Sequence, residues 1–391
     1  MMRGEKLTAK ELGSSFGVAN VYIGALVGPA LVAGTYATVF FLPDGCNSLW
    51  LPFIALGIVG LLCFLAAEVI RRFKIYEYGS LAKKIYFNKK FFYTLFEIYV
   101  LASNIVGVAI VQNMSGTFMK ELFGMPDFVG MIIIGVISLF LIRYRDSLIR
   151  IVNSVMSVVM LAGFVIISIL VIMLFGPQVS EILSSWTVPE TANMGDALLR
   201  CCQFAFASSA FAITLCCVEQ PIKKHKQSIW IGLFIMICAG FMMALSCFSF
   251  LPFQSEIMND PVPLVYVMNN YIAGSYPWIP MVYYIVMLLA IISSVIPATY
   301  MISSRWQNLV PSFGPIKTDD RKNVFVAAIF IAICTAISLL GLTNIVNVGL
   351  SMLAYVGMPL VVIPICVIWP IILHKEKKKQ RILERSEAEN A

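Results

Sequence analysis

The chain has 391 residues, of which 60% are hydrophobic and 13% are charged, and its mean hydropathy is +0.87. Soluble domains carry about 25% charged residues, so this composition excludes a soluble enzyme, a nucleic-acid-binding protein and a disulfide-rich scaffold. In a membrane protein, the distribution of the basic residues behind the net charge of +7 indicates the orientation of the chain.

Ten apolar segments, closed by charged residues or by Pro and Gly, follow one another along the chain. A helix needs roughly 20 residues to cross a hydrocarbon layer about 30 Å thick, and lipid offers no partner to free backbone groups, so helices are expected. The predicted spans, numbered in chain order, are residues 14–41, 49–70, 91–119, 128–144, 148–175, 196–218, 228–251, 277–304, 323–341 and 345–373.

The basic residues test this count independently. If the N-terminus is cytoplasmic, all of the 28 Lys and Arg except Lys120 and Arg200 fall in cytoplasmic segments, which is where membrane proteins collect them. The sequence therefore predicts an all-α polytopic protein with ten transmembrane helices and both termini in the cytoplasm. We expect one transmembrane domain over 1–391, with a charged tail at 374–391, in the cytoplasmic membrane of a bacterium, and a first span that is retained because no cleavage site follows it.

The chain offers little chemistry for catalysis. Its only two histidines, His225 and His374, lie in basic cytoplasmic segments, and nine of its ten cysteines fall in spans without metal-ligand spacing. We therefore expect that the protein is not an enzyme and has no catalytic residues. We also expect that it binds no nucleic acid and no cofactor apart from Na+.

Two acidic residues lie within spans. Glu68 is close to a cytoplasmic end and is expected to pair with a basic neighbour such as Arg72, one helical turn away. Glu97 lies further into the membrane, where a carboxylate is costly and often functional, so it is the candidate for proton coupling.

The first span contains Gly28-Pro29 near its middle. Pro29 removes a backbone donor and its ring presses on the preceding turn, so the helix is expected to kink or unwind near the bilayer midplane. Non-helical backbone survives at that depth only where it lines a cavity or is buried in protein. The alternative is a proline kink with small-residue packing through Gly24 and Gly28.

The sixth span carries small and hydroxylated residues at its centre, over 203–212, which permit a break without demanding one. Spans 1 and 6 begin two halves of five helices each, about 14–175 and 196–373, and an odd number of spans gives the halves opposite orientations. Paired discontinuous helices in inverted repeats, with the site at the midplane, indicate a secondary transporter.

The eighth span contains Ser293 and Ser294 shortly before Pro297. Pro297 cannot donate to the carbonyl of Ser293, so this turn offers hydroxyls and an under-satisfied carbonyl, which are ligands for a small cation. The alternative is that the serine hydroxyls bond back to their own helix.

These features together resemble the amino acid-polyamine-organocation superfamily with the LeuT-type five-plus-five inverted repeat, most nearly the YkvI-like bacterial membrane proteins. The resemblance is carried by Tyr22-Ile23-Gly24, Val27-Gly28 and Ala33-Gly34 in the first span, and by the run from Tyr284 to Ile291 that leads to Ser293-Ser294. It implies one bound sodium ion. The implied ligands are the carbonyl oxygens of Gly24, Val27 and Ala290 and the hydroxyls of Ser293 and Ser294.

The resemblance also implies where a solute binds. The backbone at Gly28, Ala30 and Leu31 and the dipole of a half-helix suit a carboxylate, although Pro29 removes one amide and Leu31 replaces a polar side chain that helps form a second sodium site in some relatives. Phe206, Ser208 and Ser209 resemble the solute-facing part of the sixth helix.

Two further polar residues have alternatives. Asn104 in the third span either faces the cavity or makes an interhelical hydrogen bond. Arg200, with Asp196 one turn earlier, either belongs to an outer gate or forms a surface pair of small energetic weight.

The function predicted from these residues is secondary active transport of a small organic solute, an amino acid or related compound, coupled to Na+ or H+ by alternating access, with the lipid bilayer as its surroundings. The alternative is a nutrient-sensing receptor subunit with a transporter fold, similar to spore-germination permease subunits, that acts with partner subunits.

Overall fold

A computed structural model describes residues 7–26, 33–75, 78–142, 146–217, 222–258, 260, 262–311 and 318–372. Over these ranges the protein is built from helices and connecting turns, without a strand. The fold class predicted from the sequence is therefore confirmed as all-helical.

In the first half of the chain a described turn at Ala33-Gly34 precedes a short helix, so the first predicted span is divided there. The helices of this half are α1 (Ala9–Leu26), α3 (Thr35–Phe40), α4 (Leu51–Phe73), α5 (Tyr78–Ile85), α6 (Lys90–Phe123), α7 (Asp127–Ile142) and α8 (Asp146–Ser185). A 3-10 helix, Leu42–Leu49, joins α3 to α4. Gly124 ends α6 in the left-handed conformation, with φ 67°, which a residue without a Cβ adopts at no steric cost.

The second half repeats this pattern of a divided segment followed by long helices. Its helices are α9 (Met194–Ala207), α10 (His225–Phe234), α11 (Gly240–Phe250), α12 (Gln254–Ile257), α13 (Pro263–Val267), α14 (Trp278–Trp306), α15 (Asp319–Ser338), α16 (Leu342–Asn344) and α17 (Ser351–Gly357). A 3-10 helix, Ser208–Cys217, continues α9, and a π-helical turn, Ile235–Ala239, joins α10 to α11. Further π-helical turns carry the last segment on to Ile372.

Seven described helical segments are long and apolar enough to cross a membrane. They are Leu51–Phe73, Lys90–Phe123, Val165–Ser185, His225–Ile257, Trp278–Leu309, Asp319–Ser338 and Ile345–Ile372. The shorter apolar helix α7 overlaps the fourth predicted span, and the first and sixth predicted spans are the two that are divided. The chain is a multi-pass membrane protein, while the count of ten and the direction of the termini stay predictions.

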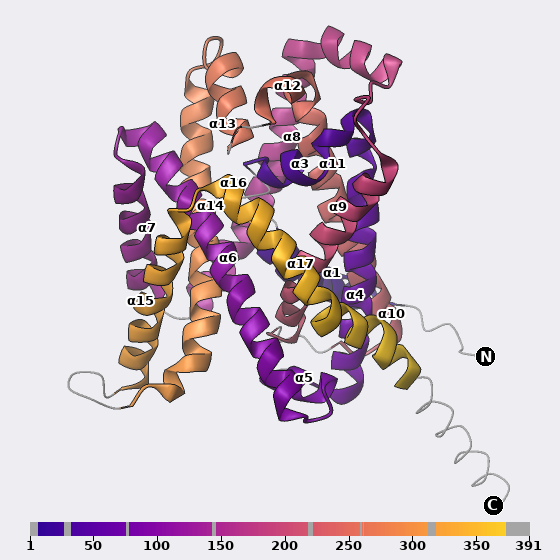
Figure 1. The fold of residues 1–391 in the computed structure, drawn as a ribbon, viewed down its shortest axis with the longest axis vertical. Coiled ribbons are helices and arrows are strands. Elements are labelled where there is room, and N and C mark those ends of the chain that lie inside the picture. The colour runs from indigo at the N-terminus through magenta and orange to yellow at the C-terminus, as the bar shows by residue number, and fades with distance from the viewer. Residues whose placement is uncertain are drawn as a thin grey trace, which may run out of the picture.

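The long helices form two groups that lie side by side (Figure 1). In one group α6 packs on α7, α14 and α15, and in the other α4 packs on α9, α10 and α11. The backbones of α4 and α10 approach closely at Gly60 and Gly232, where a Cβ on either glycine would lie about 2.6 Å or less from the carbonyl oxygen of the other, as small residues allow in membrane helices.

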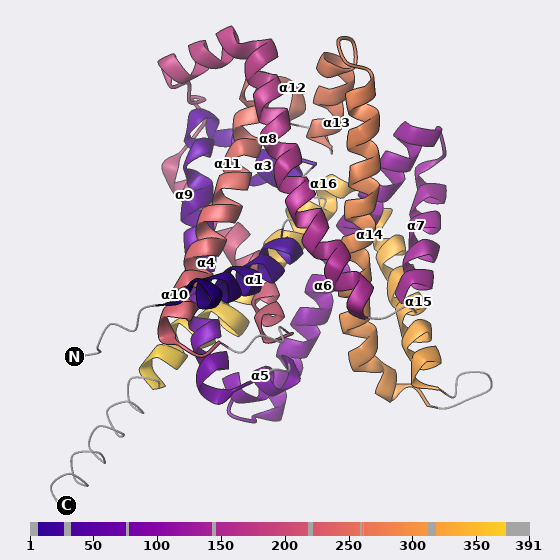
Figure 2. The same cartoon turned by 180° about the vertical axis from the view of Figure 1, so that it is seen from behind.

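Helix α1 runs obliquely across the bundle, whereas α14 follows the long axis of the molecule (Figure 2). The described part of α1 packs mainly on α8, on α10 and on the 3-10 helix Ser208–Cys217. One piece of each divided segment, α1 and the 3-10 helix Ser208–Cys217, are therefore neighbours. Helix α17 packs against α9 and α6.

Candidate functional site

A small cavity lies where the two divided segments meet α6 and the last helical segment. Its wall is partly aromatic, from Tyr36, Phe204 and Phe211. Two serines, Ser103 and Ser208, add hydroxyl groups, and Gly107, Ala207, Leu350 and Leu353 complete the described lining. The volume open to the centre of a water molecule is about 20 Å³, so the cavity has room for little more than one water. A larger solute therefore requires the cavity to widen.

The sixth predicted span changes helix type at this cavity. Helix α9 ends at Ala207, and Ser208–Cys217 continues as a 3-10 helix. The Tyr22 hydroxyl on α1 donates to the carbonyl of Ser208 at 3.0 Å, and Tyr22 is fully buried. The divided sixth segment is thus tied to the first segment at the point where its α-helix ends.

A second tyrosine reaches the same turn from α6. The Tyr99 hydroxyl lies 3.4 Å from the carbonyl oxygen of Phe206 and 3.3 Å from Oγ of Ser209, at the long end of hydrogen-bond distances. Gly357 makes room for it, because a Cβ there would overlap the Tyr99 hydroxyl and lie 2.8 Å from the Phe206 carbonyl. Of the predicted solute-binding residues on this segment, Ser208 lines the cavity, Ser209 is buried beside Tyr99, and Phe206 offers its carbonyl to Tyr99.

The first divided segment approaches the cavity through α3. Gly34 precedes α3 with φ 89°, and a Cβ on it would overlap the Phe250 ring, so both conformation and space require glycine. The carbonyl of Ala33 accepts a hydrogen bond from the amide of Leu264 at 3.0 Å. The Gly28-Pro29 pair, together with the predicted positions Val27, Ala30 and Leu31, lies outside the described residues.

An aromatic cluster closes the cavity on the side of α3 and α9. The Phe204 ring makes edge-to-face contacts with Tyr36, Phe40 and Phe41 at centroid distances of 5.7, 5.4 and 5.4 Å. Such contacts add about 0.5–1.5 kcal/mol per pair to the burial of the rings. The cluster therefore holds α3 and α9, one piece of each divided segment, together.

The candidate cation ligands come from two helices that are not close partners in this structure. Gly24 lies on α1 and is half-buried, Ala290 lies on α14 and is buried, and Ser294 is half-buried on α14. The main packing partners of the described part of α1 do not include α14, which packs on α6, α8, α15 and α7. The placement of the Ser293 side chain is outside what the structure describes.

Two predicted polar residues on α6 are engaged in local contacts. The Asn104 side-chain amide donates to the carbonyl of Val100 in its own helix at 2.8 Å, instead of to another helix. Glu97 forms an ion pair with Arg305 at the end of α14.

The prediction that Arg200 pairs with Asp196 is wrong. Arg200 on α9 forms an ion pair with Asp44 instead of Asp196, and its Nη2 donates to both carboxylate oxygens of Asp44, at 2.7 and 2.8 Å. The Asp44 side chain is only 2% exposed and that of Arg200 is 26% exposed, so this is no surface pair. No local pattern indicates it, because Asp44 and Arg200 are 156 positions apart. Glu68 does contact Arg72, at 3.5 Å, but lies nearer to Arg71, at 2.5 Å, and also to His225, at 3.1 Å.

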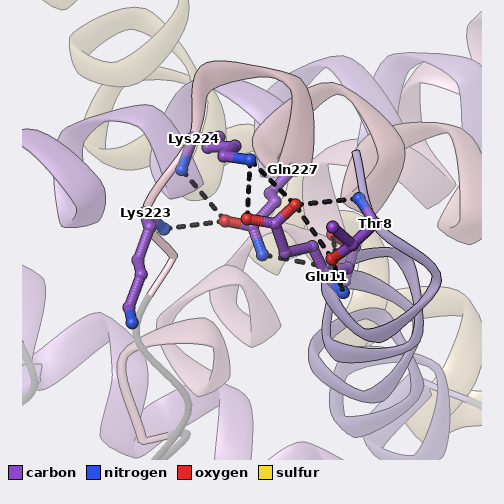
Figure 3. A network of polar contacts seen from close by, with 6 residues as sticks. Thr8, Glu11, Lys223, Lys224 and Gln227 are labelled. Carbon is purple, nitrogen blue, oxygen red and sulfur yellow. Dashed lines mark hydrogen bonds and ion pairs between the residues drawn. The ribbon is translucent and has the colours of Figure 1, made fainter. Parts of the chain in front are cut away.

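A polar network joins the start of α1 to the start of α10 (Figure 3). The Lys224 ammonium donates to the Glu11 carboxylate at 2.9 Å, and the Gln227 amide donates to the Glu11 carbonyl at 3.3 Å. The oxygen of Gln227 accepts from the amides of Lys223 and Lys224 and so caps α10. The Lys224 ammonium has the largest effect on the Glu11 carboxyl and, together with the Thr8 amide, holds the pKa of Glu11 below its usual value.

Among the solved structures whose arrangement is similar to that of this chain are three transporters. A Na+-coupled sialic acid symporter in a substrate-bound outward-open state is 15% identical, with 90% of this chain and 79% of that chain covered and a TM-score of 0.62. MhsT in complex with L-phenylalanine is 12% identical over 94% and 98% of the two chains, with a TM-score of 0.61. Mhp1 in an inward-facing conformation is 16% identical over 90% and 75%, with a TM-score of 0.56.

The sequence matches no family model and no curated protein. At identities this low the structural likeness shows the fold alone, and that fold is of the LeuT type. The likeness extends over at least 90% of this chain in all three comparisons.

Proposed function

We propose that this protein is a secondary active transporter of a small organic solute, an amino acid or a related compound. The observation that carries the proposal is the cavity at the junction of two divided segments in a LeuT-type fold. Sites at the midplane between discontinuous helices of two repeats are the usual arrangement in secondary transporters. The proposed location is the cytoplasmic membrane of a bacterium.

The proposed solute lies against Ser208 and the neighbouring turn of the sixth segment, with Ser209, Phe206 and Asn104 behind it. Backbone groups at Gly28, Ala30 and Leu31 complete the site from the first segment. Backbone amides at the start of a half-helix favour a negative group such as a carboxylate, which is why an amino acid is the preferred solute.

Sodium is the preferred coupling ion. The proposed ligands are the carbonyls of Gly24, Val27 and Ala290 and the hydroxyls of Ser293 and Ser294. Ion binding would stabilise the conformation that brings these groups of the first and eighth segments together. Proton coupling through Glu97 is the weaker candidate, because Glu97 is paired with Arg305.

The proposed cycle is a rocking of one helix group against the other across ten spans arranged as an inverted repeat, 14–175 and 196–373. The packing of α4 with α9 and α10, and of α6 with α7, α14 and α15, supports two bodies of this kind. Alternating access by such motion is common among transporters with inverted repeats.

Uptake into proteoliposomes tests the function. Purified protein is reconstituted, and entry of radiolabelled neutral amino acids is measured under an inward Na+ gradient, an inward H+ gradient, or neither. We expect uptake above equilibrium with the Na+ gradient, abolished by an ionophore that collapses it. Absence of gradient-dependent uptake of any amino acid or related compound would overturn the proposal, and binding without uptake would favour the receptor alternative.

A further inference from the structure

None of the described residues that line the cavity has a charged side chain. Its polar side chains are those of Tyr36, Ser103 and Ser208, and the other lining residues are aromatic, aliphatic or glycine. Moving a charged group from water to such a wall is strongly unfavourable without an opposite charge to pair with it. The part of a solute that lies against this wall is therefore uncharged.

The aromatic part of the wall is held in place. Phe204 is buried and packs edge-to-face on Tyr36, Phe40 and Phe41, so its ring has little freedom to turn away. Pockets with fixed aromatic walls and a few hydroxyls suit apolar or aromatic groups, which the hydroxyls orient.

Gly107 leaves open space on the α6 side of the same cavity. A Cβ added there would meet no described heavy atom within 4 Å. Gly116, on the same helix, is different, because its Cβ would lie 2.6 Å from the carbonyl oxygen of Asp127. Gly116 is thus required by the packing of α6 on α7, whereas no packing contact requires Gly107, although glycine weakens a helix relative to alanine.

We propose that the cavity accepts a net-neutral solute with an apolar or aromatic side group, and that Gly107 sets the largest side group that fits. This inference rests on the solute site proposed above and adds the chemical class of the solute. The space beside Gly107 receives the end of the side group, and Phe204 and Phe211 cover its faces.

A graded series at Gly107 tests the proposal by binding, which does not depend on transport. Purified wild-type, Gly107→Ala and Gly107→Leu proteins are titrated with L-alanine, L-leucine, L-phenylalanine, L-glutamate and L-lysine, and affinity is read from the rise in melting temperature. Gly163→Leu on α8 is the matched control, because a Cβ there also meets no described atom within 4 Å but lies away from the cavity lining.

The wild type should bind phenylalanine and leucine and should not bind glutamate or lysine. Gly107→Leu should lose about tenfold to a hundredfold in affinity for phenylalanine, while its affinity for alanine changes by less than about threefold. Gly107→Ala should show a smaller loss in the same order, which keeps the test valid if the leucine variant does not fold. Gly163→Leu should match the wild type.

Three outcomes overturn the inference. These are binding of glutamate or lysine as tight as that of phenylalanine, unchanged phenylalanine affinity in both Gly107 variants, and no binding of any of the five amino acids. If the neutral amino acids bind with the predicted size order but no uptake follows in proteoliposomes, the solute class stands and the transport function fails.

Discussion

Replacing Gly357 with alanine tests the contact that holds the turn of the sixth segment against α6. The added Cβ would overlap the Tyr99 hydroxyl and would lie 2.8 Å from the Phe206 carbonyl and 3.1 Å from the Ser209 hydroxyl. Contacts this short force neighbours to shift, and inserting a methyl group into a packed interior costs about 1–3 kcal/mol.

The nearest of these atoms can be removed separately. Tyr99→Phe deletes the hydroxyl and with it the contacts to Phe206 and Ser209, at a cost of about 0.5–1.5 kcal/mol for a typical hydrogen bond. In the double variant the phenylalanine ring leaves space for the methyl group that Gly357→Ala introduces, so the two effects should add to less than their sum. We expect a favourable coupling of about 1 kcal/mol, within the range for residues in contact.

Melting temperatures at one fixed scan rate measure this cycle, because heating a membrane protein in detergent is often irreversible. Gly163→Ala is the control and should change little, since no described atom lies within 4 Å of its Cβ. A Gly357→Ala protein as stable as the wild type, or a strictly additive double variant, would refute the packing described here.

Three other perturbations test separate contacts. Asp44→Asn and Arg200→Gln should each lower the melting temperature, because Asp44 is buried and Nη2 of Arg200 donates to both of its oxygens. In a double-mutant cycle the two should couple by about 1.5–3 kcal/mol, as hydrogen bonds to charged groups do; additive effects would contradict this. Glu11→Gln should lower the melting temperature at pH 7 but not below the pKa of Glu11. A carboxyl whose pKa folding depresses stabilises the folded state above its unfolded pKa and loses that effect as pH falls through the folded pKa, so an equal difference at both pH values would rule the ion pair out. Ser294→Ala should reduce the rise in melting temperature that Na+ produces relative to choline, and an unchanged rise would remove Ser294 from the proposed ion site.

The all-helical fold was predictable because it follows from local sequence. Apolar runs long enough to cross a bilayer must be helical. The small, hydroxylated stretch over 203–212 permits the end of α9 at Ala207 without requiring it. The seven described helices that meet the length and hydropathy criteria leave out three predicted spans. These are the fourth, where α7 is short, and the first and sixth, which are divided into shorter pieces.

Charge partners were predictable only where they are close in sequence. Glu68 contacts Arg71 and Arg72 three and four residues away, as helical spacing requires. Its third partner, His225, and the partner of Arg200, Asp44, come from distant parts of the chain. A single sequence carries no information on such pairs until the packing of the helices is known.

The tyrosines at the sixth segment show why its geometry could not be derived locally. No glycine or proline lies between Gln203 and Ala212, so nothing in that stretch forces the α-helix to end. The carbonyls around Ser208 instead receive hydroxyls from Tyr22 on α1 and Tyr99 on α6. In a bilayer, backbone that leaves the α-helix must be stabilised by neighbouring helices, so the donors that fix a break can lie entirely outside the broken segment. A buried tyrosine in an otherwise apolar span is therefore a signal to be read together with the interrupted helix it reaches, and Tyr99, with Gly357 opposite it, is such a case.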